Sequence, residues 1–244
     1  MGFLPRIRLV VDYDLANGVS FTLEKDQSHY LATVMRKTVG DQVALFNGRD
    51  GEWWADLSEV SKRAVTVTVT EQLRPQQKEP DIWLAFAPIK SARTDFIVEK
   101  ATELGVAHLL PIRTDRTNAA RIKEERFNAT VREAAEQCER LTLATVAPYQ
   151  PLSSLLASWP EDRALFFADE MLEGRSLMEL AGALPKGSPC GLLIGPEGGF
   201  TKQERSKILA HKATIACHLG PRILRADTAA LAGLSLLHSA IGDW

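Results

Sequence analysis

The residues best suited to bind a ligand in this sequence lie in two loops of its C-terminal half. The first loop, GPEGGF at 195–200, has three glycines, which permit unusual backbone angles and close approach of a ligand to the main chain. A helix should follow, because Thr201 and Glu204 have the Thr-x-x-Glu spacing of a capping box. A tight turn that binds no ligand is the alternative interpretation of such a loop.

The second loop, LGPRILRADT at 219–228, precedes another expected helix. Asp227 or Thr228 could cap that helix, and its first N–H groups would attract an anion. Arg222, Arg225 and two apolar residues between a Gly-Pro turn and a helix start indicate the wall of a pocket. An ordinary connection with arginines that face solvent is the alternative.

Several kinds of ligand are disfavoured by motifs that the sequence lacks. It contains no GxGxxG for a dinucleotide, no GxxxxGK[ST] for nucleotide phosphates and no GxSxG nucleophile elbow. Cys138, Cys190 and Cys217 form no CxxC pair and have no metal-ligand spacing to the histidines. We therefore expect neither a disulfide nor a bound metal ion.

The composition is that of a folded, cytoplasmic protein. Hydrophobic residues make up 45% of the 244, enough for one large core or two modest ones. No run approaches the length of a membrane-spanning helix, and the N-terminal residues lack the apolar region of a secretory signal. We expect no membrane partner.

Charge does not mark the whole protein as a binder of nucleic acid, because its net value is only −2. Any RNA site must therefore be a local patch. One candidate is the basic run from Arg113 to Arg126, for which a solvated helix face is the alternative. Trp53 and Trp54 could stack on bases, but neighbours on a strand point to opposite faces, so at most one can do so.

The elements of the first third of the chain are short strands joined by turns, with one helical stretch near Gln27 to Met35. Ala64 to Thr70 alternate strictly, as a half-buried strand does. Asn47-Gly48 and Asp50-Gly51 are hairpin signals, because these residue types tolerate positive φ. We expect a small β-barrel over residues 1–72.

A change of pattern divides the chain after this region. Residues 73–80, LRPQQKEP, are polar, contain two prolines and predict a linker. Residues 81–244 alternate apolar runs with amphipathic helices, which predicts an α/β domain with a parallel sheet covered on both faces. Ligands of such sheets bind outside the carboxyl ends of the strands, where both loops lie.

Six segments carry a resemblance to a known family. They are LLIGPEGGF at 192–200, LGPRILRADTAAL at 219–231, KATELGV at 100–106, EAAEQCER at 133–140, PRI at 5–7 and HYLATVMRKTVGD at 29–41. In these segments, which follow the family's order and span nearly the whole chain, the sequence resembles the RsmE-type 16S rRNA (uracil-N3) methyltransferases of the SPOUT superfamily.

The resemblance implies a PUA-like RNA-binding barrel followed by a SPOUT-type methyltransferase domain whose C-terminal part is threaded into a trefoil knot. It also implies a homodimer with both knotted loops at the interface. Physical reasoning alone would not predict the knot, because connections that thread loops are essentially absent from proteins.

The same resemblance implies S-adenosyl-L-methionine as methyl donor, S-adenosyl-L-homocysteine as product, and no metal. Carried onto this sequence, the donor site comprises Ile194, Gly195, Pro196, Glu197, Gly198, Gly199, Leu219, Gly220, Ile223, Leu224, Arg225 and Thr228. A third loop, Ala168 to Glu170, is a less close match. Asp227 stands where the family has a glutamate, and SARTD at 91–95 departs from the family's Lys-Gly-x-Arg/Lys-Met run.

Methyl transfer from a sulfonium requires positioning and desolvation, and neither a metal nor a covalent nucleophile. The N3–H of uracil is a poor nucleophile, so a base, or a cation that stabilises the developing anion, should lie near the methyl group. We assign the cation to Arg225, with a phosphate or intersubunit contact as the alternative. Glu197 is interpreted as an acceptor for N–H groups of its own loop.

Arg6, Arg8, Arg36, Arg113 and Arg116 are predicted to contact RNA phosphates. The sequence thus predicts methylation of N3 of a uridine in small-subunit ribosomal RNA, free or in the assembled subunit. One alternative is a knotted RNA methyltransferase that acts on a ribose 2′-OH or another base. The other is a non-catalytic RNA-binding factor for ribosome assembly.

Overall fold

The computed structural model describes residues 7–117, 122–171 and 175–244. Arg6, one of the predicted RNA contacts, lies outside the described residues. The chain forms two compact units, which are treated one at a time below. The first extends to Lys78 and also includes Ala135–Leu143, and the second comprises Glu79–Ala134 and Ala144–Trp244.

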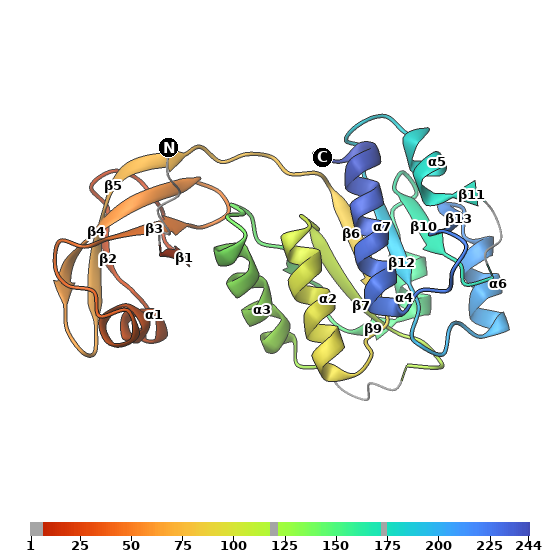
Figure 1. The fold of residues 1–244 in the computed structure, drawn as a ribbon, viewed down its shortest axis with the longest axis horizontal. Helices are drawn as coiled ribbons and strands as arrows, with labels where there is room; N and C mark the ends of the chain where they lie inside the picture. The colour runs from red at the N-terminus through yellow and green to blue at the C-terminus, as the bar shows by residue number, and fades with distance from the viewer. Residues whose placement is uncertain (1–6, 118–121, 172–174) are drawn as a thin grey trace. The chain divides into compact units, whose positions relative to one another are not determined.

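The first unit is a curled five-stranded sheet with one helical segment (Figure 1). Its elements are β1 (Arg8–Val10), β2 (Ser20–Thr22), α1 (Lys25–His29), the π-helical turn η1 (Tyr30–Val34), β3 (Gln42–Phe46), β4 (Glu52–Val60) and β5 (Val65–Arg74). The strand order is β1-β3-β4-β5-β2, so β1 and β2 are the edges of the expected small barrel among the described strands. Strand β5 continues two residues into the segment for which the sequence predicts a linker.

Local sequence signals in this unit act as expected. Val65, Val67 and Val69 are fully buried while the threonines between them are half-buried, which confirms the alternating strand. Gly51 adopts a φ of 83° in the turn between β3 and β4, where a Cβ atom would lie 2.2 Å from the carbonyl oxygen of Arg74. Trp53 packs against the core of the unit, as expected for one of the two neighbouring tryptophans.

Arg8 is part of this core. Its side chain donates to Glu52 Oε1 at 2.6 Å and to the carbonyl oxygens of Ala135, Glu136 and Arg140 at 2.7, 2.8 and 2.9 Å. The residue is 5% exposed. The predicted phosphate contact by Arg8 is therefore wrong, because its donors are already engaged inside the protein. These bonds also explain why Ala135–Leu143 belongs to the first unit.

Glu52 balances the buried charge of Arg8. Burial raises the pKa of this carboxyl group, but hydrogen bonds and charges from Arg74 and Arg8 outweigh burial, so the pKa lies below its usual value. Arg74 donates from Nε to Glu52 Oε2 at 2.8 Å. The ionised carboxylate thus holds two arginines of the first unit together.

The second unit is a parallel sheet with helices on both faces, which confirms the predicted α/β domain. Its strands are β6 (Ile82–Phe86), β7 (His108–Arg113), β8 (Thr145–Val146), β9 (Gln150–Pro151), β10 (Ala164–Ala168), β11 (Arg175–Ser176), β12 (Cys190–Ile194) and β13 (Thr214–His218). Its helices are α2 (Ser91–Glu103), α3 (Glu124–Gln137, shared with the first unit from Ala135), α4 (Leu152–Ser158), α5 (Leu177–Gly182), α6 (Lys202–Ala210) and α7 (Ala226–Ile241).

The main sheet has the strand order β11-β13-β10-β12-β6-β7-β8, with β9 beside β7. Alternate residues of β12 serve the two faces. Leu193 belongs to a core cluster with Leu155 of α4 and Ile208 of α6. Leu192 meets Gly233 of α7, where a Cβ atom would lie 2.5 Å from its side chain. In Figure 1, α2 and α7 run along this second face. The trefoil knot stays a prediction.

No helix among the residues that the structure describes is both long and apolar enough to span a membrane.

Candidate functional site

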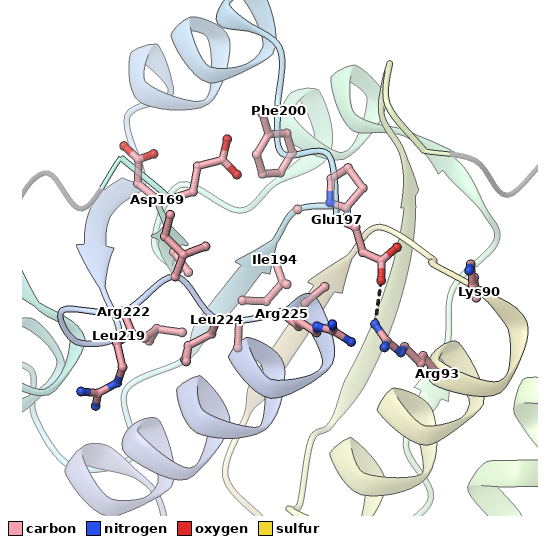
Figure 2. A pocket seen from close by; sticks show the side chains of 17 residues that line it. Lys90, Arg93, Asp169, Ile194, Glu197, Phe200, Leu219, Arg222, Leu224 and Arg225 are labelled. Atoms are coloured by element: carbon pink, nitrogen blue, oxygen red, sulfur yellow. Dashed lines mark hydrogen bonds and ion pairs between the residues drawn. The ribbon is translucent and has the colours of Figure 1, made fainter.

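A cavity of about 530 Å³ lies at the carboxyl ends of β10, β12 and β13 (Figure 2). It is lined by Lys90, Arg93, Ala168, Asp169, Glu170, Ile194, Gly195, Pro196, Glu197, Phe200, Leu219, Arg222, Ile223, Leu224, Arg225, Ala226 and Ala229. Three of the loops that follow parallel strands therefore meet at one place, as expected for a ligand site in such a sheet.

The first glycine loop is anchored by the helix that follows it. The N–H of Thr201 donates to Glu204 Oε2 at 2.8 Å, and the N–H of Glu204 donates to the Thr201 hydroxyl at 3.3 Å, so the predicted capping box is confirmed. Glu204 Oε1 also accepts the N–H of Asp115 at 2.7 Å. These bonds fix the C-terminal side of the loop.

Glycine is required in this loop for close packing. A Cβ atom on Gly195 would lie 2.6 Å from the ring of Phe200. Gly199 has a φ of 67°, and a Cβ atom there would lie 2.1 Å from a carboxylate oxygen of Glu170. The loop after β10 therefore packs directly against the glycine loop.

Asp169, in the loop after β10, is held by an ion pair. Asp169 is 2% exposed, and its carboxylate accepts from Arg205 Nη2 at 2.6 Å and Nε at 3.0 Å. Asp169 also accepts the N–H of Met171 at 3.2 Å. This carboxylate therefore shapes the cavity wall, with its charge compensated.

The second loop leads into α7 earlier than expected. Arg225 occupies the N-cap position, and its carbonyl accepts the N–H of Ala229 at 2.7 Å. The prediction that Asp227 or Thr228 caps this helix is wrong, because both residues lie inside its first turn. No side chain caps α7, and Asp227 instead accepts the N–H of Thr228 at 3.0 Å.

An arginine from α2 links the two glycine loops. Arg93 donates to Glu197 Oε1 at 2.7 Å, the pair dashed in Figure 2, and its Nε lies 3.8 Å from Asp227 Oδ2. The expectation that Glu197 binds N–H groups of its own loop is therefore replaced by an ion pair. Arg222 and Arg225 have no ion-pair partner within the described part of the chain.

Eight of the predicted donor-binding residues meet at this cavity. They are Ile194, Gly195, Pro196, Glu197, Leu219, Ile223, Leu224 and Arg225. Gly198, Gly199, Gly220 and Thr228 do not line it.

The sequence analysis did not predict Lys90, Arg93, Phe200, Ala226 and Ala229 as lining residues, whereas Arg222 was expected in a pocket wall and does line the cavity. Lys90 belongs to the connection after β6 and Arg93 to the first turn of α2 that follows it, and β6 pairs with β12. They could have been found from the order of the strands, which no local motif encodes.

The remaining arginines predicted to bind RNA are exposed. Arg36 has a φ of 52°, and Arg113 ends β7. Arg116 donates from Nη1 to the carbonyl oxygen of Gly198 at 2.7 Å, which brings it to the first glycine loop. Their contacts with RNA stay predictions.

Cys217, in β13, is not an activated thiol. Burial and the nearby charge of Asp169 raise the pKa of Cys217 to about 12, so this thiol is protonated at neutral pH. Within the described ranges, no three His, Cys, Asp or Glu side chains are grouped as a metal site.

Both parts of the chain are similar to known protein domains. The model of the RNA methyltransferase domain matches residues 76–238, and that of the RNA methyltransferase PUA domain matches residues 23–70. The ribosomal RNA small subunit methyltransferase E of Rickettsia conorii is 32% identical over 93% of this chain and 93% of its own length. The Bacillus subtilis enzyme of the same name is 30% identical over 89% of each.

Two solved structures have the same fold and hold the same ligand. A methyltransferase of Legionella pneumophila with bound S-adenosylmethionine matches 99% of this chain and all of its own, with a TM-score of 0.89 and 28% identity. The ribosomal RNA small subunit methyltransferase E of Neisseria gonorrhoeae, also bound to S-adenosylmethionine, matches 98% and 100%, with a TM-score of 0.87 and 26% identity. This chain belongs to the RNA methyltransferase family that includes these ribosomal RNA small subunit methyltransferases E.

Proposed function

We propose that this protein transfers a methyl group from S-adenosyl-L-methionine to N3 of a uridine in 16S ribosomal RNA. The observation that carries the proposal is the cavity at the carboxyl ends of β10, β12 and β13, in a chain whose relatives are named ribosomal RNA small subunit methyltransferase E. Solved relatives of the same fold hold S-adenosylmethionine.

The residues of the cavity fit this donor. Its volume of about 530 Å³ falls in the range of cofactor sites, about 300 to 1,000 Å³. Ile194, Leu219 and Leu224 offer apolar surface to an adenine ring. Glycine backbone in the first loop allows close approach to polar parts of a ligand. The donor, when bound, supplies both the methyl group and its own leaving group.

Arg225 is proposed to promote the reaction by stabilising charge on the uracil. As the proton leaves N3, negative charge spreads over N3 and the two neighbouring imide oxygens, and this charge is discharged when N3 bonds the methyl group. A guanidinium that has no carboxylate partner within the described residues retains its donors for such an oxygen. Arg205 neutralises Asp169 and Arg93 neutralises Glu197, so these two acidic residues of the wall do not compete for Arg225.

The protein is further proposed to act as a homodimer in the cytoplasm, on free RNA or on the small subunit. Ile223 in the second loop is 78% exposed, and Leu231 and Leu236 of α7 are only half-buried. Apolar surface of this kind favours association with a second copy. Light scattering at micromolar concentration should give twice the mass of one chain.

The test uses the purified protein, S-adenosylmethionine with a labelled methyl group, and small subunits or free 16S RNA from cells that lack this protein. We expect one labelled nucleoside, identified by mass spectrometry as 3-methyluridine. Label on a ribose oxygen or another base would favour the other methyltransferase activities. Donor binding without transfer to either RNA would contradict the proposal, and absence of donor binding would favour an assembly factor.

A further inference from the structure

A second cavity of about 500 Å³ lies directly beside the first. The two cavities share Lys90, Pro196 and Glu197 as lining residues. The second one lies at the N-terminal ends of α2 and α3 and reaches Gly198. Gly198, predicted to contact the donor, therefore faces the neighbouring space.

The lining of the second cavity carries excess positive charge. Lys90, Arg116, Lys123 and Arg126 oppose Asp95 and Glu197. Both carboxylates already have arginine partners, since Arg126 binds Asp95 and Arg93 binds Glu197. Neither carboxylate therefore neutralises the positive charge of Lys90 or Lys123.

Two lysines precede helices at this cavity. Lys90 is the N-cap of α2, which has no acidic residue in its first turn and no side-chain cap. The carbonyl of Lys123 accepts the N–H of Arg126 at 3.0 Å at the start of α3, whose Glu124 and Glu125 are not among the lining residues. Neither lysine side chain forms an ion pair within the described ranges.

A cation at the positive end of a helix is unfavourable, and a bound anion relieves this repulsion. Arg116 adds a third cation, whose only hydrogen bond among the described residues goes to the neutral carbonyl of Gly198. Helix ends and unpaired cations on separate segments thus converge on one space. The ligand of this cavity should carry negative charge.

Another part of the lining is apolar. It consists of Pro88, Ile89, Ile122, Phe127 and Pro196. Pro196 belongs to both cavities, so a group that packs against it lies at the boundary with the first. A nucleotide matches both parts of this lining, because it has a negatively charged phosphate and a flat base that can pack against apolar side chains.

We infer that the second cavity receives the target nucleotide of the RNA. Lys123 and Arg116 hold its phosphate, and its base lies against Pro196, at the boundary with the donor cavity. This inference rests on the proposed function, because the neighbouring cavity must hold the methyl donor. Lys123 is a positioning residue, which fixes where the uridine is presented.

The test compares Lys123→Ala with the unaltered full-length protein on small subunits. We expect KM for the RNA substrate to rise about tenfold, because a charged contact is lost. The dependence of RNA affinity on salt should become shallower by about one phosphate contact. Affinity for S-adenosylmethionine, measured by calorimetry, should stay unchanged, and Lys123→Arg should restore KM.

The matched control is Lys212→Ala. Its side chain is 85% exposed, and its ammonium lies 3.9 Å from Glu161, so it carries the same charge elsewhere on the second unit. If Lys123→Ala and Lys212→Ala have equal KM and salt dependence, the inference is overturned while the methyltransferase function stands.

A separate measurement applies if the unaltered protein transfers no methyl group, which would contradict the proposed function. Binding of uridine 5′-monophosphate is then measured by calorimetry, in the presence of S-adenosylhomocysteine. Affinity lowered about tenfold by Lys123→Ala, and not by Lys212→Ala, supports a nucleotide cavity. Equal affinities of the three proteins overturn it.

Discussion

Arg8 in the first unit and Arg225 in the second have opposite surroundings. Arg8 is 5% exposed and makes four hydrogen bonds to a carboxylate and three carbonyls. Arg225 lines a cavity and has no carboxylate partner among the described residues. The first arginine thus stabilises the fold, whereas the second retains its donors for a ligand. The partners of an arginine, and not its position in a basic pattern, determine which of these roles it has.

The largest effect on stability should follow Arg8→Ala. The substitution leaves Glu52 buried without one of its two arginines, and breaking such a pair costs about 3 to 5 kcal/mol. Urea unfolding at neutral pH should show this loss in the free energy of unfolding. Arg36→Ala, which removes an exposed arginine of the same unit, should change it by less than about 0.5 kcal/mol. Equal stabilities of the two variants would contradict the structural role of Arg8.

Arg225→Ala should have the reverse profile. We expect kcat for methyl transfer to fall about 100-fold, as when one donor to a developing oxyanion is removed. The free energy of unfolding should change by less than about 0.5 kcal/mol, because no ion pair is broken. Arg222→Ala is the matched control, since Arg222 lines the same cavity from the same loop. An equal loss of kcat in both variants would mean that the cavity needs only positive charge.

Acid should destabilise the protein through Glu52. The folded-state pKa of this group is lowered from 4.5, so its ionised form contributes stability above that value. The contribution is lost as the pH falls through the folded-state pKa. Glu52→Gln should lower stability at neutral pH, and its unfolding free energy should then fall less steeply than that of the unaltered protein below about pH 4.5. If the free energy of unfolding of Glu52→Gln and that of the unaltered protein fall equally steeply with pH, Glu52 is not the group through which acid destabilises the protein.

Local chemistry made much of this molecule predictable. Three short-range patterns predicted their elements correctly. They are the alternation from Ala64 to Thr70, the glycine loop and the Thr201 capping box. The partners of Arg8 could not be found in this way, because they lie 44 to 132 residues away in the chain.

The cavity shows the same limit. Lys90 and Arg93 reach it only because β6 pairs with β12, about a hundred residues later. Strand order depends on tertiary packing, which no single loop reveals. The prediction placed the start of α7 too late, because Asp227 and Thr228 are good N-caps by residue type. In the structure the helix begins at Ala226.

Arg93→Ala should have the smallest effect on function of the three arginine substitutions. The surroundings of Arg93 are intermediate between those of Arg8 and those of Arg225. Arg93 is paired like Arg8, but its side chain is 34% exposed and that of its partner Glu197 is 45% exposed. Solvent screens such a pair, so it should contribute at most about 1 kcal/mol to stability. Because the pair joins the first glycine loop to α2, its loss should weaken S-adenosylmethionine binding by only severalfold.

Salt separates this pair from a direct donor contact. The difference in donor affinity between Arg93→Ala and the unaltered protein should shrink at high ionic strength, where an exposed ion pair is screened. Glu197→Gln should have a similar effect, and the double variant should be no worse than either single one, because both remove the same interaction. If donor binding is lost altogether in Arg93→Ala, or if the two substitutions add, Arg93 contacts the ligand itself and belongs with Arg225 in this comparison.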